Sequence, residues 1–180
     1  TVHVEVCDES DFGEIHDLLK SNKVGVGLAI NPDTSMPDWS KKFIPTIDQI
    51  IVMSVVPGKS GQKYIENTHD KTKNLLINLK ENGFSGYIEA DGGVNLDNIG
   101  ECFADGARAF VGGSAIIGQT DVRLVIREFR NQVLRTRRKL LIQKANELGG
   151  TELVNKWIDL HILGKKKDEL TQIATELGYQ

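Results

Sequence analysis

Cysteine and long hydrophobic runs are scarce in this sequence of 180 residues. The two cysteines, Cys7 and Cys102, do not have the spacing of a metal motif, and we expect reduced thiols, as in a cytoplasmic protein. No apolar run approaches the roughly 18 residues that a membrane-spanning helix needs, and no secretory signal opens the sequence. Because 39% of the residues are hydrophobic and 26% are charged, we expect one soluble globular protein with no membrane partner.

A strong excess of charge of one sign is also lacking, since the formal net charge is −3. Residues 121–180 are basic overall, but their lysines and arginines alternate with acidic residues in helical patterns. No RNA-binding or helix-turn-helix motif accompanies them. We therefore interpret the basic residues as solvated helix faces and expect no nucleic-acid partner.

What the sequence has is a regular alternation of short apolar runs and amphipathic segments. Such an alternation is typical of a parallel sheet built from strand–helix units, and the regular spacing favours a (β/α) barrel over an open sheet. In the run "YIEAD", the residues Tyr87, Glu89 and Asp91 share a polar face, which suits the inside of a barrel. The predicted fold is α/β, a partial (β/α)8 TIM barrel with five strands at residues 1–6, 24–30, 49–55, 86–90 and 107–113.

The expected helices lie between and after these strands. The first has Ser10 as its N-cap and a buried face formed by Phe12, Ile15, Leu18 and Leu19. Others span residues 66–82, follow Asn95, and fill the sequence from residue 121 onward. We predict a barrel-type domain over residues 1–138 and a helical C-terminal extension over residues 139–180 that packs on it.

The histidines are expected to have structural or surface positions. His3 and Glu5 share the inner face of the first predicted strand and are expected to form a buried, satisfied pair. The remaining histidines, His16, His69 and His161, are expected on the surface of helices or loops.

Glycine and polar residues gather where the predicted strands end. In a (β/α) barrel the carboxyl ends of the strands hold the active site, and the last two loops often bind phosphate. Gly92–Gly93 and Gly112–Gly113–Ser114 lie in those positions, where glycine lets backbone N–H groups approach an anion. The alternative is that these glycines only make tight turns. Two such loops in adjacent units favour phosphate binding.

Three further residue types could take part in chemistry at this edge. Asp91 ends a strand on its inner face and could bind a metal or transfer a proton, although capping the next turn is an equal alternative. Met53 could form the floor of a substrate site or simply fill the core. Lys59 and Lys63 lie on a glycine-containing loop, which fits attraction of phosphate or plain solvation better than a Schiff base.

Four ordered motifs resemble one known family. The segments "VGLAINPDT", "VMSVVPGKSGQKYI", "IEADGGVN" and "FVGGSAI" look like the later motifs of the D-ribulose-5-phosphate 3-epimerases, and "HVEV" resembles the fourth strand of that family. The resemblance covers about residues 1–135 and implies a (β/α)8 barrel. The implied activity inverts carbon 3 of a ketopentose 5-phosphate by acid–base proton transfer between two aspartates, assisted by a divalent metal such as Zn, Fe, Mn or Co.

The resemblance also implies roles for individual residues. Asp91 would be a metal ligand and one of the two acid–base aspartates. Met53 would lie beneath the sugar. The phosphate would be held by Gly92, Gly93, Gly113 and Ser114, and the mobile loop over the substrate would be formed by Gly58, Lys59, Ser60 and Gly61. Lys59 and Ser60 stand where the family has an aromatic residue and a glycine, so closure of this loop is expected to differ.

The resemblance begins at the fourth strand of the family barrel. The first three strands of that barrel supply the second aspartate and two histidine ligands, so we expect this chain alone to be incomplete. The missing strands would have been lost from this sequence or be supplied by a partner or another copy. A non-catalytic phosphosugar-binding or scaffolding protein is the alternative function, and another phosphate-binding barrel enzyme is a third. The choice between pentulose and hexulose phosphate stays open.

Overall fold

The computed structural model describes residues 1–58 and 61–147. The chain divides into two compact units, Thr1–Val133 and Leu134–Gln180. The first unit holds the whole sheet. Of the second unit, the structure describes only the residues up to 147, all within one helix.

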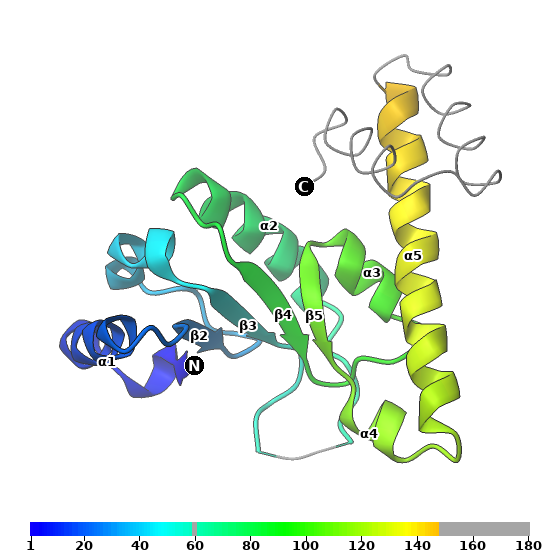
Figure 1. The fold of residues 1–180 in the computed structure, drawn as a ribbon, viewed down its shortest axis with the longest axis horizontal. Coiled ribbons are helices and arrows are strands. Elements are labelled where there is room, and N and C mark those ends of the chain that lie inside the picture. Colours follow the sequence, from blue (N-terminus) through cyan, green and yellow to red (C-terminus); the bar gives the residue numbers. More distant parts are fainter. Residues whose placement is uncertain (59–60, 148–180) are drawn as a thin grey trace. The chain divides into compact units, whose positions relative to one another are not determined.

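Five parallel strands form one sheet, and their order in the sheet is their order in the sequence (Figure 1). Each connection between neighbouring strands runs back over the sheet, which is the arrangement of a (β/α) barrel rather than of a doubly wound sheet. The structure therefore confirms a partial TIM-barrel-type α/β fold. The strands are β1 (Val2–His3), β2 (Gly27–Ile30), β3 (Gln49–Met53), β4 (Tyr87–Asp91) and β5 (Ala107–Val111).

The connections contain both α-helices and short 3-10 helices. Helix α2 packs against β3 and α3 packs against β5, whereas the β2–β3 connection contains only 3-10 turns. Among the described residues, no helix combines the length and the hydrophobicity needed to cross a bilayer. The α-helices are α1 (Glu9–Ser21), α2 (Thr68–Glu81), α3 (Ile99–Ala104), α4 (Gly113–Ile117) and α5 (Val122–Glu147), and the 3-10 helices are Val4–Val6, Asp38–Lys42 and Ile44–Thr46.

The two faces of the sheet differ as the alternation in the sequence predicts. Apolar side chains of β2, β3 and β4 point to the helices and form the core with residues of α1, α2 and α3. The opposite face carries polar groups such as Glu89 and Asp91, which are only partly buried. The fully buried side chains on the helix-facing side include Leu28, Ile30, Ile50, Val52 and Ile88.

The first predicted strand is shorter than the alternation of Val2, Val4 and Val6 indicates. Only Val2 and His3 pair with β2, and the chain then turns into the 3-10 helix Val4–Val6. The Glu5 carboxylate accepts a hydrogen bond from the backbone N–H of Asn31 at 2.7 Å. That side-chain contact replaces further strand pairing and leaves Val6 80% exposed.

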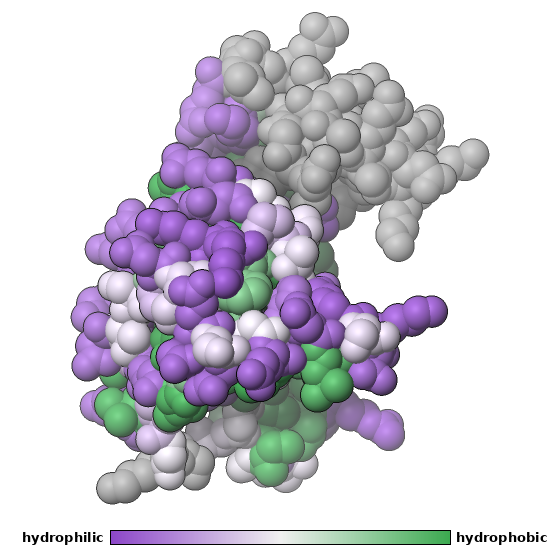
Figure 2. Space-filling view, turned by 90° about the vertical axis from the view of Figure 1, so that its left-hand side faces the viewer, coloured by the Kyte–Doolittle hydropathy of each residue, from purple (hydrophilic) through white to green (hydrophobic). Residues whose placement is uncertain are grey.

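Helix α1 begins earlier than predicted, and of its four apolar residues Phe12 is buried, Ile15 and Leu19 are half-buried, and Leu18 is exposed. Asp8, rather than Ser10, is the N-cap, because its carboxylate accepts the N–H of Asp11 at 2.9 Å. Phe12 is fully buried, but Leu18 is 64% exposed. The face of the molecule on which α1 lies is largely hydrophilic in its described part, with scattered hydrophobic residues (Figure 2).

The surface position predicted for the histidines is wrong for His69, and His16 is half-buried. His69 is 6% exposed and pairs with Asp105. The side chain of His16 is 13% exposed, and its Nε2 lies 2.9 Å from the Thr46 hydroxyl. His161 lies outside the described residues. The predicted pair between His3 and Glu5 forms at 3.4 Å, but both side chains are partly exposed, so it is not buried.

The helical C-terminal region is described in part. Helix α5 runs without a break through the predicted boundary between residues 138 and 139, and the division into compact units falls between Val133 and Leu134. Residues 148–180, which form most of the predicted extension, lie outside the described residues.

Two substitutions on α1 test the burial of its apolar face. Phe12→Ala is expected to lower the free energy of unfolding by about 3–5 kcal/mol, because it removes a fully buried ring that contacts Trp39 and Phe43. Leu18→Ala is expected to change it by less than about 0.5 kcal/mol, since that side chain is exposed. Urea denaturation measures both, and equal losses in the two variants would contradict this account of α1.

Candidate functional site

The carboxyl ends of three neighbouring strands meet in one row. Met53 is paired in register with Asp91, and Asp91 with Val111. Because the strands are parallel, the loops that follow β3, β4 and β5 all leave from this edge of the sheet. Residues far apart in the sequence are therefore brought together here.

A cavity of about 300 Å³ lies at this edge. It brings together eight residues predicted to form the site, whereas Gly112 and Lys63 do not line it. Lys59 and Ser60, which are also predicted site residues, lie outside the described residues. The cavity is lined by Met53, Gly58, Gly61, Asp91, Gly92, Gly93, Gly113 and Ser114, together with Val55, Pro57, Gln62 and Val111.

Asp91 is a partly buried acid with little electrostatic compensation. Burial raises its pKa above the ordinary aspartate value, and the nearby His3 lowers it only in part. Burial also raises the pKa of Glu89, two residues earlier on the same face, and the charge of Asp91 adds to that shift. The side-chain amide of Gln49 donates a hydrogen bond to the Glu89 carboxylate at 2.8 Å, and this bond lowers the pKa of Glu89 again in part. A raised carboxyl pKa brings proton transfer closer to neutral pH.

Met53 combines the two positions considered for it. Its side chain is 8% exposed, as in a core residue, yet it lines the cavity directly beside Asp91. Met53 therefore forms an apolar part of the cavity wall next to the Asp91 carboxylate.

The glycines after β4 are required by the fold itself. Gly92 and Gly93 have φ values of +115° and +67°. A Cβ on Gly92 would lie 2.3 Å from the Val55 side chain, and one on Gly93 would lie 2.5 Å from the backbone N of Tyr64. Tight turning and close backbone approach thus explain both residues without a ligand.

Gly113 differs from these two glycines. A Cβ at this position would meet no atom within 4 Å, and its φ is not in the left-handed region. Protein packing therefore does not require glycine here, although the residue lines the cavity.

Ser54, which sequence reasoning missed, joins β3 to the loop after β4. Its backbone N–H donates to the Asp91 carbonyl at 2.7 Å, and its hydroxyl donates to the Gly92 carbonyl at 2.6 Å. Its carbonyl accepts the N–H of Ile65 at 2.9 Å. The signal in the sequence was a small polar residue at the end of an apolar strand.

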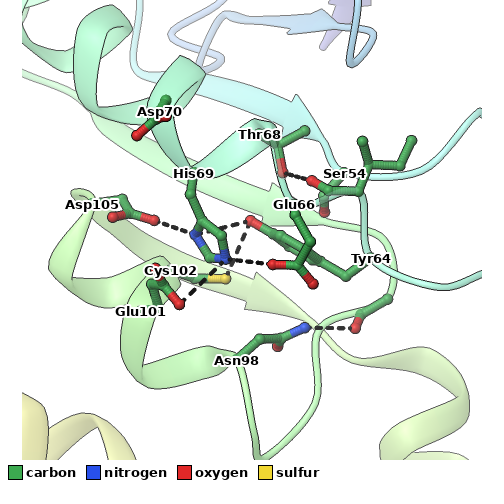
Figure 3. A network of polar contacts seen from close by, with 12 residues as sticks. Ser54, Tyr64, Glu66, Thr68, His69, Asp70, Asn98, Glu101, Cys102 and Asp105 are labelled. Carbon is green, nitrogen blue, oxygen red and sulfur yellow. Dashed lines mark hydrogen bonds and ion pairs between the residues drawn. The ribbon is translucent and has the colours of Figure 1, made fainter.

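Sequence reasoning also missed a buried polar network that includes Tyr64 of the connection after β3 (Figure 3). His69 pairs through Nδ1 with Asp105, and its ring lies over that of Tyr64 with centroids 4.8 Å apart. The thiol of Cys102 donates to the Tyr64 hydroxyl at 3.5 Å. No sequence signal identified this cluster, because its members come from a loop, α2 and α3.

The described residues do not form a metal centre on their own. None of their His, Cys, Asp and Glu side chains gather in a group of three or more that could hold a metal ion. Of the described residues that line the cavity, Asp91 is the one carboxylate. A single protein ligand does not fix a divalent cation.

Two other cavities lie in the same unit. One of about 490 Å³ adjoins the first, shares Gly93 and Ser114 with it, and is bordered by Lys63, Asn95 and Asn98. The other, of about 360 Å³, lies between the β2–β3 connection and α2. Its border includes Lys71, whose ammonium donates to three backbone carbonyls of the loop after β2.

Comparison with curated proteins gives consistent relatives. The chain is 39% identical to the ribulose-phosphate 3-epimerase of Escherichia coli K12 over 133 residues, which are 74% of this chain and 58% of the relative. It is 42% identical to that of Serratia marcescens over 59% of this chain and 50% of the relative. For Bacillus subtilis 168 the identity is 34%, over 72% of this chain and 59% of the relative.

The chain thus spans between half and three fifths of the length of these relatives. The family model described as "Ribulose-phosphate 3 epimerase family" matches residues 1–117, which include all five strands. The motifs at the strand ends, the sequential parallel sheet and this match agree, and the chain belongs to the ribulose-phosphate 3 epimerase family.

Proposed function

We propose that this chain carries the phosphate-binding loops and one acid–base carboxylate of a ribulose-5-phosphate 3-epimerase site. The single observation that carries the proposal is the cavity that gathers Asp91 and the glycine-containing loops after β3, β4 and β5. The relatives are named ribulose-phosphate 3-epimerases, which supports epimerisation at carbon 3, and the reaction proposed here is the interconversion of ribulose 5-phosphate and xylulose 5-phosphate.

The substrate is proposed to lie across the cavity with its phosphate toward the loops. Backbone N–H groups of Gly92–Gly93 and of Gly113–Ser114 would hold the phosphate, because no side chain at the glycines blocks the approach. Met53 would support the sugar carbons. The segment from Gly58 to Gly61, with Lys59 and Ser60 between them, would cover the substrate.

Asp91 is proposed to move the proton at carbon 3. Its carboxylate would take that proton from one face of the sugar, and the electron pair would delocalise onto the neighbouring carbonyl oxygen to give an enediolate. Inversion then requires a second acid to return a proton to the opposite face. Asp91 is the one carboxylate among the described residues that line the cavity, so these residues account for one of the two transfers.

A divalent metal (Zn, Fe, Mn or Co) would stabilise the enediolate oxygen when bound. Asp91 is the ligand that this chain would contribute. Because the described residues do not form a metal site on their own, we assign no step to the metal.

A non-catalytic phosphosugar-binding protein is the second candidate. The same observation favours it, because a cavity with one carboxylate can hold a sugar phosphate without inverting it. The two functions share the binding site and differ in turnover.

Substitution of Gly113 tests the binding site without disturbing the fold. Gly113→Ala is expected to weaken binding of ribulose 5-phosphate by about 10-fold or more, while the free energy of unfolding changes by less than about 0.5 kcal/mol, because the added methyl group meets no protein atom. Isothermal titration calorimetry and urea denaturation give the two numbers. Gly13→Ala on α1 is the matched control and should leave affinity unchanged. Unaltered affinity in Gly113→Ala would contradict the proposed phosphate site.

The raised pKa of Asp91 predicts a pH-dependent stability difference. The folded state binds the Asp91 proton more tightly than the unfolded state, so this group lowers stability as pH rises from about 4 through its raised pKa. Asp91→Asn is therefore expected to be more stable than the wild type near pH 7, by about 0.5 kcal/mol because the group is only partly desolvated. The difference should vanish near pH 3. Thermal unfolding measured from pH 3 to pH 7 checks this, and a less stable variant at pH 7 would refute it.

Turnover by this chain tests whether its one cavity carboxylate suffices for epimerisation. Assayed alone with each divalent metal, it is expected to epimerise ribulose 5-phosphate at least about 100-fold more slowly than the E. coli relative, since an acid–base partner contributes about 10²–10⁴. A coupled assay for xylulose 5-phosphate measures this rate. Turnover equal to that of the relative would contradict the proposal that this chain supplies one of the two acid–base groups.

A further inference from the structure

Tyr64, in the connection that follows β3, packs against Gly93 in the loop after β4. Its backbone N and Cα would lie 2.5 Å and 2.8 Å from a Cβ on Gly93, so the two backbones are packed directly against each other. The next residue, Ile65, donates its N–H to the Ser54 carbonyl at 2.9 Å. Any movement of Tyr64 therefore displaces Gly93 or opens a gap beside it.

Gly93 is held on its other side by two asparagines. The side-chain amides of Asn98 and Asn95 donate to its carbonyl at 3.1 Å and 3.3 Å. The backbone of Tyr64 and the Gln62 carbonyl are the nearest groups where a Gly93 side chain would lie. The position of the Gly93 backbone thus depends on where the Tyr64 backbone is fixed.

We propose that His69 and Asp105 are positioning residues that act on the phosphate-binding loop through Tyr64. This inference rests on the proposed function of that loop. The ring of His69 lies 4.8 Å from the ring of Tyr64, and its Nδ1 lies 3.5 Å from the Tyr64 hydroxyl (Figure 3). The same Nδ1 is paired with the carboxylate of Asp105, which fixes the ring orientation.

The pair is deeply buried and tightly surrounded. The side chains of His69 and Asp105 are 7% and 1% exposed. Lys73 lies 3.3 Å from the second carboxylate oxygen of Asp105. On the other side of the ring, the carboxylates of Glu66 and Glu101 lie 3.8 Å and 3.7 Å from Nε2, which has no hydrogen-bond partner among the described residues.

Stability alone does not account for such a pair. Apolar residues of similar volume in place of both partners of a buried hydrogen-bonded pair can leave a protein equally or more stable, because the polar groups lose their hydration on burial. The contact between Nδ1 and the Asp105 carboxylate instead holds the His69 ring in one orientation against Tyr64.

Tyr64 and Cys102 contribute packing and hydrogen bonding rather than proton transfer. Burial raises the pKa of Tyr64 far above its ordinary value, and burial also raises the pKa of Cys102 to about 11. Both groups are therefore neutral near pH 7. The network positions the loop and takes no part in the chemistry.

The test substitutes both residues of the pair and compares the effects with those of substituting a histidine elsewhere in the chain. In the double variant His69→Leu/Asp105→Ala, affinity for ribulose 5-phosphate is expected to fall by about 5-fold to 10-fold, with a shifted backbone amide signal for Gly93 in NMR spectra. His16→Leu is the matched control, because His16 is also largely buried and hydrogen-bonded but lies on α1. It should change neither quantity. Unchanged affinity and an unmoved Gly93 signal in the double variant would overturn the proposal, as would equal effects in His16→Leu.

Conservative variants separate positioning from general folding. His69→Asn keeps an amide donor close to the position of Nδ1 and is expected to restore most of the affinity and the Gly93 signal. Asp105→Asn keeps the shape of the carboxylate and serves as the second variant if the double variant does not fold. Failure of both conservative variants to differ from the double variant would contradict positioning through the hydrogen bond.

Hydrogen exchange distinguishes failure of this inference from failure of the proposed function. If the wild-type chain does not bind ribulose 5-phosphate, the proposed function is wrong. The amide of Ile65 should still exchange at least about 10-fold faster in the double variant than in the wild type, while that of Ala29 in β2 is unchanged. An unchanged Ile65 amide would overturn the positioning role independently of any ligand.

Discussion

The parallel pairing of β3 with β4 is the constraint on which the candidate site depends. It aligns Met53 with Asp91, and Ser54 extends the connection through its bonds to the carbonyls of Asp91 and Gly92. The loops that follow the two strands therefore start from a fixed relative position. The cavity exists because these loops, with the loop after β5, diverge from one edge of the sheet.

This arrangement has an energetic cost that is concentrated at the site. Asp91 is partly desolvated without a strong cationic partner, and Gly92 and Gly93 occupy backbone conformations that other residues adopt only with strain. The apolar core on the helix-facing side of the sheet offsets the cost of the polar groups on the opposite face and at the carboxyl edge.

The sequence predicted the positions of the strands and the gathering of Asp91 and the glycines at one edge of the sheet, because both depend on local patterns. Alternation in "YIEAD" placed Asp91 on the inner face, and glycines marked where the loops turn. The errors have a different origin. The strand after Thr1 was predicted too long because the contact between Glu5 and Asn31 joins residues that are distant in sequence. His69 was expected at the surface because nothing near it in the sequence indicates Asp105 as its partner. Leu18 fits the helical period but faces solvent, since no other element covers that part of α1 among the described residues.

The central claim is that the edge cavity binds the phosphate of a sugar phosphate. A crystal structure of this chain with ribulose 5-phosphate tests it most directly. The account predicts the phosphate between Gly92–Gly93 and Gly113–Ser114, with the sugar over Met53 and beside Asp91. A sugar phosphate bound in the cavity bordered by Lys71, with no ligand in the edge cavity, would contradict the account.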